Sequence, residues 1–197
     1  MRTIAVVGVM LLGATLAGAQ DGFEGQQPAY RGDVAATYQW VRSNTPNGSC
    51  DCFNLTGGGI SASWRLLPRM SGVADVSLEH ASNVLGSGQS LTLSSYTAGP
   101  RFRLLRSWKH SPHTPEPFAQ ILVGAAHAGG GAAGAGDRSN VFAARAGAGI
   151  DWKLRGGFAV RLVQVDYYLT DFANSTNNHQ NNLLVGSGLL YRWSREN

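Results

Sequence analysis

Apolar and polar residues alternate in eight segments of the chain after residue 32. A period of two is typical of strands, because successive side chains point to opposite faces. Each segment has at least the roughly 9–11 residues that a tilted strand needs to cross a hydrocarbon layer. The segments cover residues 33–42, 53–65, 72–81, 90–103, 117–128, 141–152, 158–168 and 181–193.

The two faces of these segments differ in a consistent way. In residues 141–152, Phe142 and Ile150 share a continuously apolar face, whereas Arg145 and Asp151 share the other face with glycines. A soluble core strand would carry its bulk on the inner face and its polar residues in water. A polar face crowded with glycine instead suits the narrow interior of an eight-stranded barrel. The pattern therefore predicts an apolar face toward lipid and a polar face toward a lumen.

The connections between the segments also alternate in character. Long connections rich in Gly, Ser or Asn are expected at residues 43–52, 82–89, 129–140 and 169–180. Two of the other three, 66–71 and 153–157, are tight, while 104–116 is long and basic. Long loops at one end and mostly short turns at the other are typical of outer-membrane barrels. The predicted fold class is all-β, an eight-stranded antiparallel up-and-down transmembrane β-barrel.

Aromatic residues gather near the two ends of the predicted strands. Such belts favour membrane interfaces, where amphipathic rings are most stable. The alternative is an ordinary aromatic core in a soluble lipocalin-like or sandwich fold. One rim is predicted to hold Trp64, Phe102, Phe118, Trp152, Phe158 and Trp193, and the other Trp40, Phe53, Phe142 and Tyr167.

The phase of the strands places four acids and four bases inside the lumen. They are Asp75, Glu79, Asp151 and Asp166, with Arg101, Arg145, Arg161 and Arg192. Isolated charges would be costly in a narrow, partly dehydrated interior, so pairing is expected. Those expected to form one layer near the short turns are Asp75, Arg101, Asp151, Arg161 and Arg192. The network predicts a plugged lumen, and a gated path for ions is the alternative.

The seventh segment breaks the alternation. Arg161 falls in the opposite phase from Gln164 and Asp166. A β-bulge near residues 162–163 would bring all three inward. Without a bulge, Arg161 would face lipid and extend its head group toward the interface. We favour the bulge.

The first residues of the chain predict export. Residues 1–19 combine a short basic start, an apolar run of residues 4–16 and a small-residue cleavage site, which is the layout of a signal peptide. Residues 20–32 are expected to be a flexible segment, 33–193 the barrel and 194–197 a C-terminal tail. The net charge of +4 over the whole chain is small and scattered, which argues against a nucleic-acid partner.

Cys50 and Cys52 are separated by a single residue. A strained local disulfide is the favoured interpretation in an oxidising compartment. Free thiols and a metal or redox role are the alternatives. No cofactor or metal site is predicted.

Several blocks of the sequence resemble a known family. They are residues 97–104, 117–127, 146–154 and 160–170, together with the last strand. The chain resembles the OmpA-like and OmpX-like eight-stranded outer-membrane barrels of Gram-negative bacteria, and is most similar to the acidobacterial members made of a signal peptide and a barrel alone. This resemblance implies a monomer in the outer membrane, in contact with its lipid and lipopolysaccharide.

The last strand resembles the signal that the barrel-assembly machinery reads in this family. Gly188, Tyr191 and Trp193 match the signal. Gly186 stands where the family has a polar residue, and Trp193 is not the last residue. No counterpart of the peptidoglycan-binding domain that follows the barrel in OmpA is expected, so the resemblance implies no tether to the cell wall.

One short stretch offers enzymatic chemistry. His80, Ser82 and Asn83 resemble the His-x-Ser-Asn motif of outer-membrane lipid A deacylases, and a His and a Ser two apart share a strand face. The motif lies on an earlier strand than in those enzymes, and the downstream Glu has no match. The sequence thus favours a non-enzymatic outer-membrane barrel with a structural or surface-interaction role. A narrow pore for small solutes is the alternative, followed by a deacylase-like enzyme or a soluble exported binding barrel.

Overall fold

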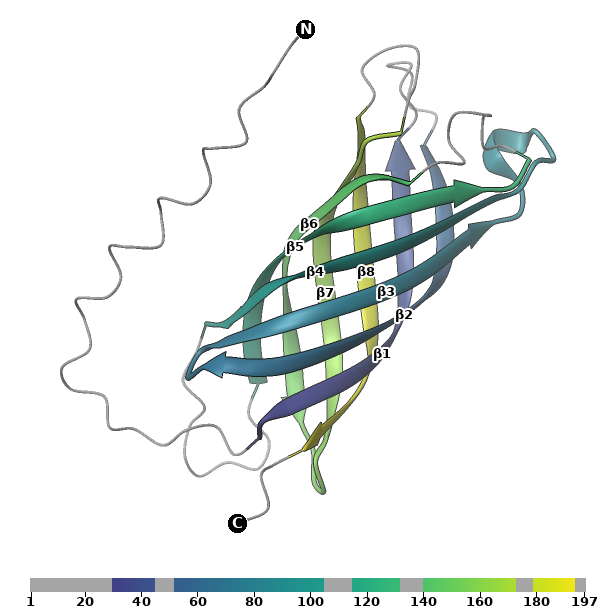
Figure 1. The fold of residues 1–197 in the computed structure, drawn as a ribbon. Coiled ribbons are helices and arrows are strands. Elements are labelled where there is room, and N and C mark those ends of the chain that lie inside the picture. Colours follow the sequence, from purple (N-terminus) through teal and green to yellow (C-terminus); the bar gives the residue numbers. More distant parts are fainter. Residues whose placement is uncertain (1–29, 45–51, 105–114, 132–139, 173–178, 194–197) are drawn as a thin grey trace, which may run out of the picture.

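The structure is a computed structural model that describes residues 30–44, 52–104, 115–131, 140–172 and 179–193. Eight strands make up nearly all of this part of the chain (Figure 1). They are β1 (Gly32–Asn44), β2 (Cys52–Leu67), β3 (Met70–Ala81), β4 (Leu91–Arg103), β5 (Pro115–Gly129), β6 (Val141–Lys153), β7 (Phe158–Thr170) and β8 (Gln180–Trp193). A single 3-10 turn, η1 (Val84–Gly86), lies between β3 and β4.

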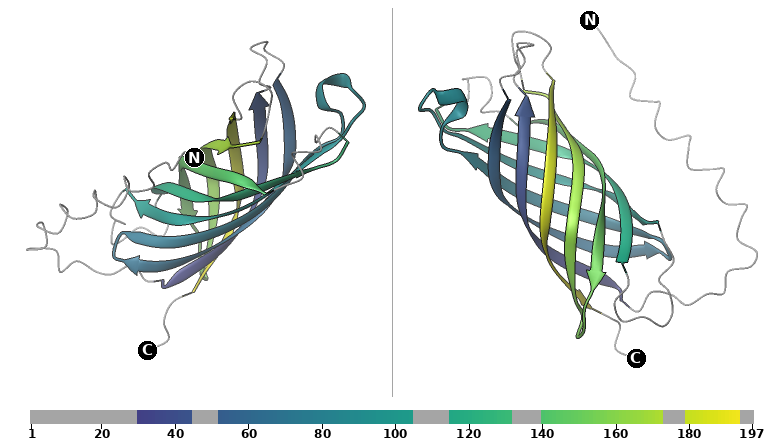
Figure 2. Two further views of the ribbon diagram at one scale, coloured as in Figure 1. Left: turned by 45° about the horizontal axis from the view of Figure 1, so that its top comes forward. Right: turned by 180° about the vertical axis from the view of Figure 1, so that it is seen from behind.

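Each strand pairs antiparallel with the next, and β1 pairs with β8 to close the barrel. The closure is long: Gly32 lies opposite Trp193, and the pairing continues to Ser43 opposite Asn182. Figure 2 shows β1 and β8 side by side along the wall. Closure removes every exposed sheet edge. The predicted fold is therefore confirmed, with predicted strand ends within three residues of those observed.

Side chains alternate between the interior and the outer surface along the strands, with an interruption in β7. In β3, Asp75 and Glu79 are buried inside, while Val76 and Leu78 are exposed outside. Val73, which breaks the apolar phase of this strand, faces the interior and is buried. The outer wall carries many exposed large apolar side chains, from Ile60 of β2 to Leu189 of β8.

A β-bulge interrupts β7 where the sequence pattern slips. The register shifts between Arg161 and Gln164 against β8, so that Leu162 and Val163 together face Ser187. Leu162 and Val163 point outward, and Arg161 and Gln164 are both buried inside. The Ser187 hydroxyl donates a hydrogen bond to the Arg161 carbonyl at 3.0 Å, which connects the bulged segment to β8. The predicted bulge is confirmed.

The two ends of the barrel differ as predicted. Pro68 and Arg69 suffice to join β2 to β3, and residues 154–157 join β6 to β7. The C-terminal end of β8 lies at this turn end (Figure 1). The long basic connection predicted at 104–116 is described only at its edges, where Pro115 and Glu116 already belong to β5.

Candidate functional site: an ion-paired lumen

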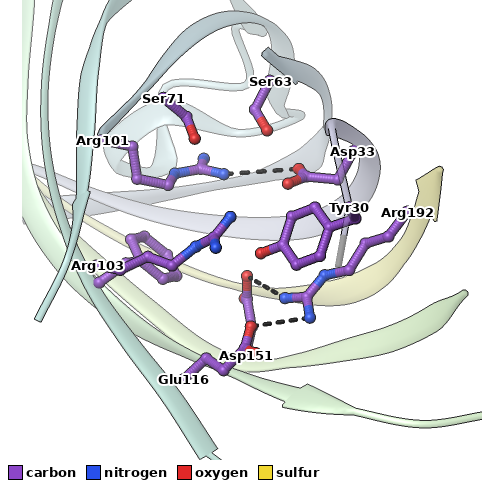
Figure 3. A pocket seen from close by; sticks show the side chains of 10 residues that line it. Tyr30, Asp33, Ser63, Ser71, Arg101, Arg103, Glu116, Asp151 and Arg192 are labelled. Carbon is purple, nitrogen blue, oxygen red and sulfur yellow. Dashed lines mark ion pairs between the residues drawn. The ribbon is translucent and has the colours of Figure 1, made fainter. Parts of the chain in front are cut away.

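Six charged side chains from six strands form a layer inside the barrel near the turn end, here called the turn-end layer. They are Asp33, Arg101, Glu116, Asp151, Arg161 and Arg192, and all are buried. Each occupies an inward position of its strand; strand phase directs five of them to the lumen, and the β7 bulge directs Arg161 there. Figure 3 shows five of them around the pocket at this end.

Ion pairs connect the turn-end layer around the lumen. Arg192 bridges two strands, with Nη1 2.8 Å from Glu116 Oε2 and Nη2 3.5 Å from Asp151 Oδ2. The other Asp151 oxygen accepts a hydrogen bond from Arg161 Nε at 2.9 Å. Arg101 Nη1 lies 3.8 Å from Asp33 on β1. The carboxylates thus compensate guanidinium groups that would otherwise be buried and uncompensated.

One aromatic ring, that of Phe118, separates two of these guanidinium groups. Phe118 is almost fully buried between Arg101 and Arg161, with its ring centre 4.7 and 4.6 Å from the two Cζ atoms. Such stacking is favourable because the ring face is electron-rich. The prediction that Phe118 belongs to the outer aromatic belt is therefore wrong. It lies at the predicted rim but faces inward, in the same phase as Gln120.

Tyr30 closes the turn end of the lumen from outside the barrel strands. Its ring lies 4.3 Å from the Arg103 Cζ and 4.5 Å from the Arg192 Cζ, between the two side chains (Figure 3). Burial raises the pKa of the Tyr30 phenol, although the two arginines oppose the shift. The pocket around Tyr30 holds about 10 Å³, which is room for roughly one water molecule. The segment predicted to be flexible, 20–32, is thus fixed at Tyr30, while 20–29 lies outside the described residues.

A second group of side chains, here called the middle layer, is organised by Arg145. Its guanidinium reaches across the lumen from β6 to β3, with Nη1 2.8 Å from Asp75 Oδ1. Nη2 donates hydrogen bonds to the hydroxyls of Ser77 and Ser95. The Tyr168 ring lies 4.6 Å from the Arg145 Cζ. Asp75 therefore belongs with Arg145 in the middle layer, and its predicted place in the turn-end layer is wrong.

Amide side chains complete the middle layer. The Asp166 carboxylate accepts hydrogen bonds from Gln164 Nε2 at 2.6 Å and from Gln120 Nε2 at 3.1 Å. Gln120 Oε1 in turn accepts two hydrogen bonds from Arg101, which links the two layers. Glu79 is fully buried in the same part of the lumen.

Above the charged layers, the loop end of the lumen holds an apolar cluster next to the buried polar residues Ser43, Thr170 and Asn182. Side chains from all eight strands form one buried cluster, here called the apolar plug. Its members are Val41, Leu55, Ala81, Leu93, Ala126, Ala143, Tyr168 and Leu184. Phe53, Val84, Leu91, Val141 and Phe172 pack against it. The sequence predicts an ion-paired network in the lumen and does not predict this apolar cluster.

All eight predicted lumen charges are indeed buried inside, but the prediction missed three contributors. Asp33 shares the phase of the buried Gln39, so strand phase could have placed it inside. Glu116 was assigned to a turn because β5 begins earlier than predicted, at Pro115. Tyr30 precedes the alternating pattern and leaves no such signal.

The stretch with potential enzymatic chemistry lies on the outside. His80 is exposed, and its Nδ1 lies 2.9 Å from the Thr92 hydroxyl rather than beside a carboxylate. Ser82 follows the end of β3 and is exposed. Nothing in this arrangement orients a base toward a nucleophile.

Candidate metal ligands and thiols can be placed only in the part of the chain that the structure describes. There, no group of three or more His, Cys, Asp or Glu side chains is placed to bind a metal ion. No described helix has the length and hydropathy needed to span a membrane. Cys52 begins β2, whereas its predicted disulfide partner Cys50 lies outside the described residues.

The predicted assembly signal lies on the closing strand. The Tyr191 ring is exposed on the outer face and meets Phe158 edge to face at 5.3 Å between ring centres. Trp193 packs beside Trp64 at 6.0 Å. A side chain at Gly188 would strike the Ala36 carbonyl of β1, so glycine permits the close approach of β8 to β1.

No protein-family model matches the sequence. No curated protein matches it either. Solved structures do match by fold. Neisserial surface protein A is similar with a TM-score of 0.64 and 13% sequence identity, over 82% of this chain and 97% of that one. Ail, the attachment invasion locus protein of Yersinia pestis, has a TM-score of 0.50 and 13% identity, over 83% and 100%. The chain therefore has the fold of small eight-stranded outer-membrane barrels.

Proposed function

We propose that the protein is an integral outer-membrane barrel with a structural or surface-interaction role and a lumen that does not conduct. The main observation behind the proposal is that the outer wall is apolar and the interior is charged, which is the reverse of a soluble protein. The outer wall exposes large apolar side chains, such as Tyr38, Ile60 and Leu189, each more than 60% exposed. The interior holds the charges. This distribution would be unstable in water and is favourable in lipid.

The belt at the turn end supports the same proposal. Trp64, Phe102, Phe158 and Tyr191 are all exposed on the outer wall. Rings in this position favour the boundary between hydrocarbon and head groups. With this belt at the periplasmic interface, the loops face outward, where they would contact lipopolysaccharide or a surface partner.

Two kinds of closure support a non-conducting lumen. Ion pairs and Tyr30 fill the turn end, and the apolar plug fills the loop end. An ion would have to displace paired charges and then cross a dry apolar constriction.

The predicted signal peptide of residues 1–19 would deliver the chain for export, and Gly188, Tyr191 and Trp193 would present the assembly signal.

Membrane insertion can be tested by electrophoresis and fractionation. An inserted barrel migrates differently before and after boiling, and it sediments with the outer membrane. Migration that boiling leaves unchanged, together with a soluble periplasmic protein, would support the soluble binding barrel instead.

The closed lumen needs a separate test. Purified protein in planar bilayers should give no steady conductance, and Tyr30→Ala should give none either, because the apolar plug remains. Steady conductance of the native protein would favour the narrow pore.

A further inference from the structure

Exposed positive charge gathers at one end of the barrel. Four exposed basic residues lie before β1, in the β2–β3 turn and around the β6–β7 turn, and are here called the basic collar. They are Arg31, Arg69, Lys153 and Arg155. Since β6, β7, β8, β1, β2 and β3 are consecutive in the wall, these residues follow a continuous arc of the turn end.

The collar has no exposed acidic counterpart in the described residues. Of the carboxylates that the structure describes, all except Asp171 are buried inside the barrel. Those nearest the collar, Asp33, Glu116 and Asp151, are engaged with the internal arginines Arg101 and Arg192. The internal charges are thus compensated within the lumen, and the positive charge of the collar is directed to the surroundings.

The collar is also continuous with the aromatic belt. The Arg31 guanidinium lies 4.7 Å from the centre of the Trp64 ring, and its backbone N–H donates a hydrogen bond to the Trp193 carbonyl at 2.7 Å. Arg155 is separated from the outward ring of Phe158 by two glycines. Cations held directly beyond an aromatic belt lie at the depth of the lipid head groups.

We infer that the basic collar binds anionic phospholipid head groups in the leaflet at the turn end. This inference rests on the membrane insertion proposed above. A phosphate accepts charge-assisted hydrogen bonds from guanidinium groups, and basic residues near an anionic surface strengthen binding to it. Lipopolysaccharide carries the same phosphate chemistry, but the described loop end offers one exposed basic residue, Arg42. The charge distribution therefore favours the opposite leaflet and its phospholipids.

The test compares two brominated lipids as quenchers of tryptophan fluorescence. The intact barrel is inserted into phosphatidylcholine vesicles that hold a small fraction of brominated phosphatidylglycerol or brominated phosphatidylcholine, without lipopolysaccharide. Trp64 and Trp193, which lie beside the collar, report the lipid in contact with it. We expect brominated phosphatidylglycerol to associate at least about threefold more strongly than the zwitterionic lipid.

Two variants and a salt series complete the design. The triple variant Arg31→Gln, Arg69→Gln, Arg155→Gln should lose the preference, and Arg42→Gln at the loop end should keep it. Raising the salt concentration of the native sample from about 0.05 to 0.5 M should weaken the preference, and this arm remains decisive if the triple variant does not fold.

Equal association of the two lipids with an inserted native barrel would overturn the inference, as would a preference that survives both the triple variant and high salt. Boiling-dependent migration, checked on the same samples, reports insertion separately. A native chain that does not insert would refute the proposed function itself.

Discussion

Arg145 and Asp75, which are 70 positions apart in sequence, meet across the lumen at 2.8 Å. The two residues belong to β6 and β3, which are not neighbours in the wall. The pair therefore connects opposite sides of the barrel within the middle layer.

Removing one partner of this pair should be far more costly than removing both. Arg145→Met leaves the buried Asp75 carboxylate without its counter-charge, so we expect a loss of about 3–5 kcal/mol in the free energy of unfolding. In the double variant Asp75→Asn, Arg145→Met the uncompensated charge is gone, and part of that stability should return. Urea unfolding in vesicles, followed by tryptophan fluorescence, measures both.

Arg42→Gln is the matched control, because Arg42 is an exposed arginine outside the lumen. Its free energy of unfolding should stay within about 0.5 kcal/mol of the native value. A double variant that is no more stable than Arg145→Met would show that the uncompensated Asp75 carboxylate is not the cause of the lost stability.

Gly147 keeps the middle layer compact. A Cβ added at Gly147 would strike both the Asp166 carboxylate and the Val165 carbonyl. Gly147→Ala should therefore cost about 1–3 kcal/mol through overpacking. Gly129→Ala is the matched change, since nothing lies within 4 Å of a Cβ there. Equal unfolding midpoints for the two variants would contradict this account of the glycine-rich inner face.

Strand phase explains which side chains the sequence correctly predicts inside the lumen, and it also explains why the prediction for Phe118 was wrong. The inward positions of Arg145 and Asp166 follow from a period of two, and the same rule would have placed Phe118 inside. An aromatic ring at a strand end is typical of the outer belt, but the stacked guanidinium groups of Arg101 and Arg161 make an inward ring favourable here.

Partnerships within the lumen could not be read in the same way. Which charges meet depends on the register of all eight strands and on side chains that cross the interior, and phase specifies neither. Strand phase thus predicts Asp75 beside the turn-end charges. The long Arg145 side chain instead crosses the lumen and pairs with Asp75, which makes Asp75 part of the middle layer. The sequence does not predict the apolar plug for a related reason, because each strand contributes only one of its eight members.

Tyr30 predicts a dependence of stability on alkaline pH. Burial raises the pKa of the folded phenol, while an unfolded tyrosine titrates near its ordinary value of about 10. Below that pH both states hold the proton, so the contribution of Tyr30 to stability is constant. Above it the unfolded chain loses the proton first, and the free energy of unfolding should fall as pH rises.

Tyr30→Phe keeps the ring between Arg103 and Arg192 but removes the titrating group. Unfolding free energies at about pH 8, 10 and 11 should fall less steeply for this variant than for the native protein. Identical slopes would mean that the hydroxyl is not buried.

The bulge in β7 makes a prediction that a regular strand could not. Leu162 and Val163 together oppose Ser187 of β8, and β6 skips Leu162 between Asp151 and Ile150. Deletion of Val163 would leave one outward residue between Arg161 and Gln164, which restores strict alternation against both neighbours. The shortened chain should therefore insert, with migration that still depends on boiling.

Deletion of Tyr167, in the regular part of β7, would turn every later side chain of the strand to the opposite face, including Tyr168 of the apolar plug. That variant should fail to form the heat-modifiable barrel. If the two deletion variants show the same migration before and after boiling, the additional residue of the β7 bulge does not set the strand register.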